Sequence, residues 1–217
     1  MDKWRALATL AVAKTVAIIF YFKLLRPGVL NWGASHQEAD AGLPGDGVLP
    51  SANLQTTRAI TIDAPTAAVW PWLVQMGPRP RAGAYTYDWV ERLLGIDIEN
   101  SDRILPEFQH LGPGDFVGLN AKGQGLKVIS VENERSLVLQ WQPQKSTWAF
   151  VLERNGAAST RLLSRNRLEG HGLRWVLFMR LFMEPGSLLM ERKMLFGIKS
   201  RAERLYRDQV SSVAATV

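Results

Sequence analysis

The feature that most constrains the fold of this chain is a series of short strand-like segments between residues 115 and 167. The segments are separated by turns of Gly, Pro or polar residues that recur about every ten residues. Links this short join antiparallel neighbours, because a parallel pair needs a crossover of about a dozen residues. We therefore predict an antiparallel meander with strands at Asp115 to Leu119, Leu126 to Val131, Leu137 to Trp141, Thr147 to Leu152 and Thr160 to Arg167.

One further strand and two helices are predicted ahead of this meander. Thr56 to Ile62 alternates two faces, with Arg58 on the same face as the two isoleucines, as expected for a half-buried strand. Asp63 to Gly77 has an N-cap, helical spacing of its apolar residues and a closing glycine, which predicts a helix. A second, short helix is expected from about Thr86 to Leu94, ending at a glycine. This helix would bury Trp89, Val90, Leu93 and Leu94.

The last predicted element is a long helix from about Leu173 to Arg207, interrupted at Glu184-Pro185-Gly186. In its second half, apolar residues recur every three or four positions, opposite a face with Arg192, Lys199 and Glu203. An amphipathic helix of this kind covers a sheet. The order of elements therefore predicts an α+β fold in which a strongly curved antiparallel sheet grips the last helix. The apolar face consists of Met190, Met194, Ile198, Ala202 and Leu205.

Two segments precede this predicted domain. Residues 6–22 are apolar or small apart from Thr9, Lys14 and Thr15, and at about 1.5 Å per residue they reach the lower limit for crossing a bilayer. We interpret residues 1–26 as a single-pass membrane anchor, although a helix packed on the domain fits the same residues. The expected localisation is membrane-associated, with the side of the membrane left open. Residues 27–55 are a Gly/Pro-rich arm, 56–208 the domain and 209–217 a tail.

Composition excludes several classes of function. The chain has no Cys, which removes disulfide frameworks, thiolate metal sites and cysteine nucleophiles, and its three His are far apart in the chain. We therefore expect no metal and no cofactor, and interpret His36, Glu38 and Asp40 as solvated.

The net charge of +6 arises between residues 154 and 207, a segment that contains twelve Lys or Arg and only four Asp or Glu. Without a basic run or interleaved aromatics, we expect no nucleic-acid partner.

Three motifs show a resemblance to a known family. They are Val69 to Gly77 (VWPWLVQMG), Gly83 to Trp89 (GAYTYDW) and Pro185 to Leu195 (PGSLLMERKML). With the order of elements, they resemble the SRPBCC (START-like, helix-grip) superfamily over about Asn31 to Arg207. The resemblance implies a helix-grip fold with a pocket between the sheet and the C-terminal helix. Lipid carriers, natural-product binders and polyketide aromatase/cyclases share this fold, so the resemblance implies no single function.

Candidate ligand-binding residues follow from the implied position of the pocket. The two tyrosines before the second helix are expected near its mouth, and the other candidates come from the strands and the last helix. The same residues would be core if the pocket is filled, and both interpretations stay open. No catalytic residue is assigned, because Tyr85, Tyr87, Asp88, Glu91, Glu107, His110 and His171 show no diagnostic spacing. The pocket candidates are Tyr85, Tyr87, Trp141, Trp148, Phe150, Met190, Met194 and Ile198.

Three functional hypotheses follow. The leading one is the binding or transport of a hydrophobic small molecule or lipid in the cavity, without chemistry. The alternative is an aromatase/cyclase-like enzyme that acts on a polyketide-type substrate through acid and base groups in the cavity. The third is a scaffold or stress protein whose pocket is filled. The identity of the ligand and the oligomeric state are left open.

Overall fold

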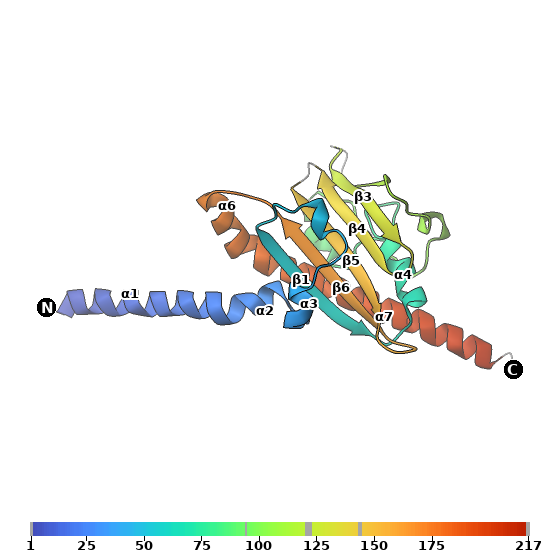
Figure 1. Ribbon diagram of the computed structural model, residues 1–217, viewed down its shortest axis with the longest axis horizontal. Coiled ribbons are helices and arrows are strands. Elements are labelled where there is room, and N and C mark those ends of the chain that lie inside the picture. Colours follow the sequence, from blue (N-terminus) through green and yellow to red (C-terminus); the bar gives the residue numbers. More distant parts are fainter. Residues whose placement is uncertain (1, 94, 120–122, 143–144, 216–217) are drawn as a thin grey trace.

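The computed structural model describes residues 2–93, 95–119, 123–142 and 145–215. A six-stranded sheet and the long helix α7 form its body, and α1 extends away from them (Figure 1). The strands are β1 (Leu54–Ile62), β2 (Phe116–Gly118), β3 (Gly125–Glu132), β4 (Ser136–Gln142), β5 (Ser146–Arg154) and β6 (Thr160–Leu168). The α-helices are α1 (Asp2–Phe20), α2 (Arg26–Leu30), α3 (His36–Asp40), α4 (Thr66–Val74), α5 (Asp88–Leu93), α6 (Leu173–Phe178) and α7 (Glu184–Ala214). The remaining helical elements are short turns. Two are π-helical, η1 (Tyr21–Leu25) and η4 (Met179–Met183), and two are 3-10 helices, η2 (Asp46–Val48) and η3 (Pro106–Phe108).

All neighbouring strands of the sheet pair antiparallel, in the order β1-β6-β5-β4-β3-β2. The predicted meander is confirmed, because β2 to β6 are neighbours in the sheet in the order in which they follow in the chain. β1 pairs with β6, with Leu54 opposite Leu168 and Ile62 opposite Thr160. A register shift between Val128 and Ser130 interrupts the pairing of β3 with β4, and such a bulge increases local twist.

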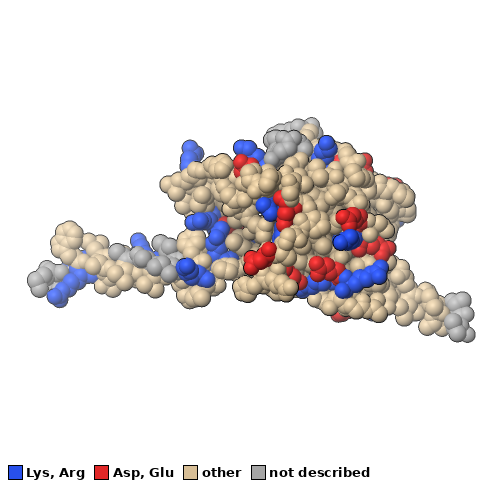
Figure 2. Space-filling view, in the orientation of Figure 1, with Lys and Arg blue, Asp and Glu red and all other residues tan. Residues whose placement is uncertain are grey.

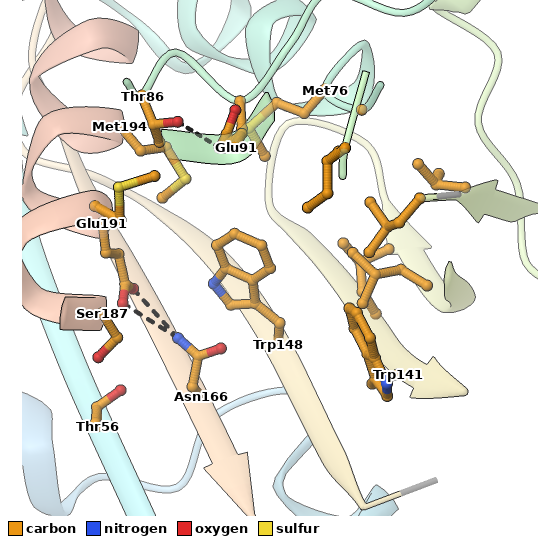
Figure 3. Close-up of a pocket in the computed structure, with 18 of the residues that line it drawn as sticks. Thr56, Met76, Thr86, Glu91, Trp141, Trp148, Asn166, Ser187, Glu191 and Met194 are labelled. Atoms are coloured by element: carbon orange, nitrogen blue, oxygen red, sulfur yellow. Dashed lines mark hydrogen bonds between the residues drawn. The ribbon is translucent and has the colours of Figure 1, made fainter. Parts of the chain in front are cut away.

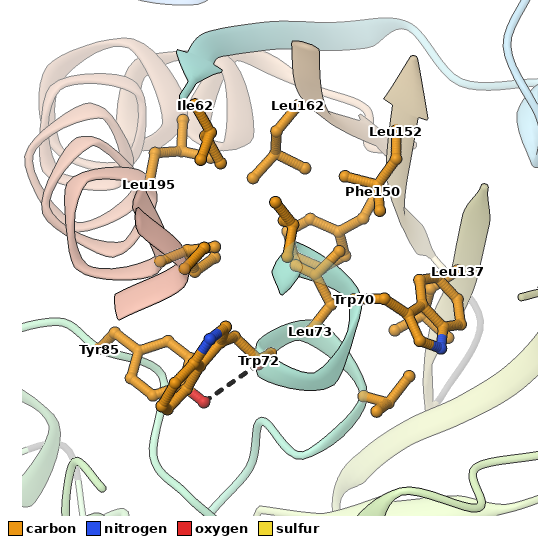
Figure 4. Close-up of a cluster of buried hydrophobic side chains, with 14 of the residues drawn as sticks. Ile62, Trp70, Trp72, Leu73, Tyr85, Leu137, Phe150, Leu152, Leu162 and Leu195 are labelled. Atoms are coloured by element: carbon orange, nitrogen blue, oxygen red, sulfur yellow. Dashed lines mark hydrogen bonds between the residues drawn. The ribbon is translucent and has the colours of Figure 1, made fainter. Parts of the chain in front are cut away.

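Helix α7 crosses one face of the sheet and supplies the centre of the core. Its side chains Met194, Leu195, Ile198 and Ala202 are all at most 1% exposed. They pack with α4 and with the inward side chains of the sheet, among them Phe150 of β5 (Figure 4). The predicted α+β helix-grip arrangement, with this face of the last helix toward the sheet, is confirmed.

Residues 34–49 of the arm cover the opposite face of the sheet, whereas Trp32 packs on Phe196 of α7. On that face of the sheet, Arg165 of β6 is 2% exposed, and its guanidinium donates to Asp46 at 2.8 Å and to the Ala41 carbonyl at 2.6 Å. Arg161 donates to Glu38 at 2.7 Å. Glu38 also closes a capping box with Ser35 at the start of α3. The interpretation of Glu38 as a solvated residue is therefore wrong, because it helps to hold the arm against β6.

The predicted membrane anchor is wrong. α1 is a helix of 19 residues, but over the ranges that the structure describes no helix is both long enough and apolar enough to cross a membrane. Lys14 interrupts the apolar run in its middle, Lys3 and Arg5 precede it in the same helix, and Figure 2 shows basic side chains along this helix. The expectation of a membrane-associated localisation rested on this anchor and is withdrawn with it.

Helix α5 buries a different residue from those predicted. Trp89 is 69% exposed and Leu93 is 80% exposed, whereas Glu91 is only 7% exposed. The helix has six residues, so it has little more than one inward position, and Glu91 occupies it. Leu94, also predicted to be buried, lies outside the described residues.

Replacing Glu38 by Gln tests how the arm is held. The hydrogen bond from Arg161 lowers the pKa of Glu38 from 4.5 to about 2. The carboxylate therefore stabilises the folded state above pH 4.5 and loses this contribution as the pH falls towards 2. We expect Glu38→Gln to lower the free energy of unfolding by about 1 kcal/mol at neutral pH, where solvent screens the pair, and by less in acid.

Urea unfolding at neutral pH and at about pH 3 measures this difference. Glu107→Gln, at an exposed position, is the control and is expected to change little at either pH. A loss of stability in Glu38→Gln that does not depend on pH would contradict the role of the charge.

Candidate functional site

A cavity of about 350 Å³ lies between the inner face of the sheet, α7 and the segment 76–98 (Figure 3). Its walls are mostly apolar. Trp141 of β4 and Trp148 of β5 line the sheet side, Met190 and Met194 line the α7 side, and Met76 comes from the segment after α4. Aromatic and methionine side chains make walls that fit apolar ligands of varied shape.

The structure divides the eight predicted pocket residues into three groups. Trp141, Trp148, Met190 and Met194 line the cavity. Tyr85, Phe150 and Ile198 belong to the close-packed hydrophobic core and are at most 1% exposed. Tyr87 does neither, and its ring lies under the ammonium group of Lys193, with 5.7 Å between the nitrogen and the ring centroid. Ligand contact by the first group stays a prediction.

Tyr85 has a structural partner for its hydroxyl group. This hydroxyl donates to the carbonyl of Trp72 at 3.0 Å and accepts from Gln75 Nε2 at 2.9 Å. Burial raises the pKa of Tyr85 above its usual range. The phenol therefore remains neutral and ties the loop before α5 to α4.

A buried ion pair forms the first polar group of the cavity. Arg58 of β1 is fully buried and its guanidinium donates to Glu191 of α7, which lines the cavity and is 6% exposed. Ser164 donates to the same carboxylate, and Asn166 Nδ2 lies 3.3 Å from both of its oxygens. Burial raises the pKa of Glu191, while Arg58 and Ser164 oppose that rise. This carboxylate is thus saturated with donors.

Sequence reasoning missed this pair. In the sequence, Arg58 shares a strand face with two isoleucines and Glu191 lies in one of the three motifs, so each residue carries a separate signal. A buried arginine needs an acidic partner. That partner lies 133 residues further along the chain, and spacing alone does not join the two.

A second carboxyl group, Glu91 of α5, lines the cavity away from the ion pair. The hydroxyl of Thr86 donates to its Oε1, whereas Oε2 is buried and has no hydrogen-bond partner within the described part of the chain. Burial raises the pKa of Glu91, as does the nearby charge of Asp88, and the bond from Thr86 opposes the rise. The sequence named Glu91 as an acid or base candidate but did not place it in the cavity.

A third carboxyl group, Glu184 at the start of α7, also lines the cavity. Arg26 pairs with both of its oxygens, at 2.8 Å each. Among the described residues that line the cavity there is no Lys or Arg, and arginines reach two of its three carboxyl groups from behind the wall. Among the described residues, no three His, Asp or Glu gather as metal ligands do.

Comparison with known proteins yields distant structural likenesses. No family model and no curated protein matches the chain. The KanY protein is 13% identical over 69% of this chain and 97% of its own, with a TM-score of 0.46. A Polyketide_cyc-like protein from Corynebacterium glutamicum is 14% identical over 73% and 93%, with a TM-score of 0.34. An HSP90 activator from Plasmodium falciparum is 12% identical over 57% and 79%, with a TM-score of 0.37. None of these likenesses indicates what this chain binds.

Gly197 of α7 sets the distance between that helix and the loop that carries Tyr85 and Thr86. A Cβ atom at Gly197 would lie 2.7 Å from the Cβ and the carbonyl oxygen of Tyr85. We expect Gly197→Ala to lower the free energy of unfolding by about 1–3 kcal/mol, because the backbone must move apart. Gly186→Ala is the matched control in the same helix, since its Cβ meets nothing within 4 Å, and we expect it to stabilise slightly. Urea unfolding measures the stability of both variants. Equal free energies of unfolding for the two would contradict a tight contact at Gly197.

Proposed function

We propose that the chain binds a mostly apolar small molecule in the cavity between the sheet and α7. The observation that supports this most is the cavity itself, about 350 Å³ with walls of Trp, Met and Leu. Ligand pockets have volumes of about 300–1,000 Å³, apolar walls and a few placed polar groups. This cavity lies at the small end of that range, which favours a single small molecule.

The filled-pocket hypothesis is less well supported. Protein interiors are packed to the density of organic crystals, and voids larger than a water molecule are few. The neighbouring core around Phe150, Leu195 and Ile198 is fully buried. An open space beside so dense a core favours the hypothesis of a ligand-binding site over that of a scaffold protein whose pocket is filled.

A cyclase-like enzyme is the second candidate, because two of the three buried carboxyl groups that line the cavity have raised pKa values. Glu91 and Glu191 both have raised pKa values, with burial as the main cause, and such groups exchange protons with a bound substrate. Closure of a poly-β-keto model compound by the wild type and by Glu91→Gln tests this. If the protein is an enzyme of this kind, its turnover number is expected to fall by a factor of about 10² to 10⁴ in the variant. Equal rates with and without protein would exclude the candidate.

A substitution that fills the cavity tests the binding proposal. N-phenyl-1-naphthylamine, whose fluorescence rises in apolar surroundings, is the probe. We expect the wild type to bind it, and Met190→Trp to weaken binding by about tenfold or more, because the larger side chain occupies the space of the probe. Fluorescence titration measures both affinities.

Leu189→Trp is the matched control, because Leu189 is the preceding residue of α7 and is 58% exposed. It adds a tryptophan at a site that the cavity does not include, so the affinity is expected to stay within about twofold. No probe binding by the wild type, or equal losses in both variants, would refute the proposal.

A further inference from the structure

Two buried polar atoms on the cavity wall have no hydrogen-bond partner among the residues described. They are Glu91 Oε2 and Thr56 Oγ1, in side chains of residues that are 7% and 4% exposed. They lie on opposite sides of Trp148 in Figure 3. A buried polar atom without a partner destabilises the protein, and a ligand that supplies the partner recovers that loss. Of the two, a carboxyl oxygen is the more costly to leave without a partner.

Glu91 differs from the other carboxyl groups of the cavity in lacking a cation. Arg26 pairs with Glu184 and Arg58 pairs with Glu191, but no ion pair holds Glu91 within the described ranges. Where the structure describes the chain, the side chain of Glu91 has one hydrogen-bond partner, the hydroxyl of Thr86. The other oxygen is therefore free to bind a ligand without breaking any contact that the fold uses.

The charges of the cavity decide which ligand group fits. A hydroxyl group donates to a carboxylate and accepts from a carboxylic acid, so it pairs with Glu91 in either protonation state. An amine donates to the carboxylate. A ligand carboxylate would add a negative charge beside Glu91, and the part of the cavity wall that the structure describes offers it no Lys or Arg.

We infer that Glu91 is the specificity-determining residue of the cavity, binding an apolar ligand through a hydroxyl or amine group and rejecting one that ends in a carboxylate. This inference rests on the proposed function. It assigns a chemical class, amphiphilic alcohols or amines, to the ligand.

Competition between matched ligands tests the inference. 1-Decanol, decylamine and decanoate differ in the polar end, and each is titrated against bound N-phenyl-1-naphthylamine at about pH 8, where decanoate is ionised. We expect 1-decanol or decylamine to displace the probe at concentrations at least about tenfold lower than decanoate. The better of these two identifies the polar group.

Variants then attribute the preference to Glu91. Glu91→Leu is expected to weaken binding of the preferred ligand by about tenfold, so that its preference over decanoate falls to near unity. Glu91→Gln keeps the hydrogen-bonding shape without the charge. We expect it to retain 1-decanol binding and to admit decanoate. The control is Glu107→Leu, at an exposed position, which is expected to change neither affinity.

The outcomes separate this inference from the proposal beneath it. If the wild type does not bind the probe, both fail. If the probe binds but decanoate competes as well as 1-decanol and decylamine, only the inference fails. The same holds if Glu91→Leu and Glu91→Gln both preserve the wild-type preference.

Discussion

Arg58 and Glu191 join the first strand to the gripping helix through an ion pair inside the protein. Taking two charges out of water costs several kcal/mol for each ion, and the attraction offsets this only where further hydrogen bonds satisfy both groups. Ser164 and Asn166 donate to the carboxylate, and Ser187 accepts from the guanidinium at 3.0 Å. Removing one partner of such a pair typically costs about 3–5 kcal/mol, because the other charge remains buried. Strands β1 and β6 and helix α7 are therefore constrained to one arrangement around the cavity.

The same two strands use arginine on both of their faces. Arg58 lies opposite Ser164 in the register and faces α7, while Arg165 lies opposite Thr57 and faces the arm. Because successive side chains of a strand point to opposite faces, neighbouring positions serve the two layers separately. Asp46 of the arm and Glu191 of α7 are the matching acids. The paired edge of the sheet thus holds the helix on one side and the arm on the other by one kind of interaction.

Periodicity predicted the strands and the inward face of α7 because those patterns depend on local geometry. It failed where the deciding contact is distant in the chain. Met194 and Ile198 lie one turn apart on the same face of α7 and both belong to the core, yet only Met194 also lines the cavity, according to what lies across from each. Glu91 took the inward position that apolar residues of α5 were expected to fill, and Trp89 is exposed. An apolar pattern cannot distinguish a filled core from a cavity, because both need the same residues.

The wall of the cavity is held open by hydrogen bonds as well as by packing. The indole of Trp148 donates to Ser164 at 2.8 Å, and Ser164 in turn donates to Glu191. The ring of Trp148 also packs on that of Phe150, with the ring centroids 4.8 Å apart. A tryptophan fixed in this way cannot turn into the empty space without breaking both contacts. Binding then spends little free energy on ordering side chains, which favours affinity for a small apolar ligand. The hydrogen bonds that join Trp148, Ser164 and Glu191 thus also keep the cavity beside them open for a ligand.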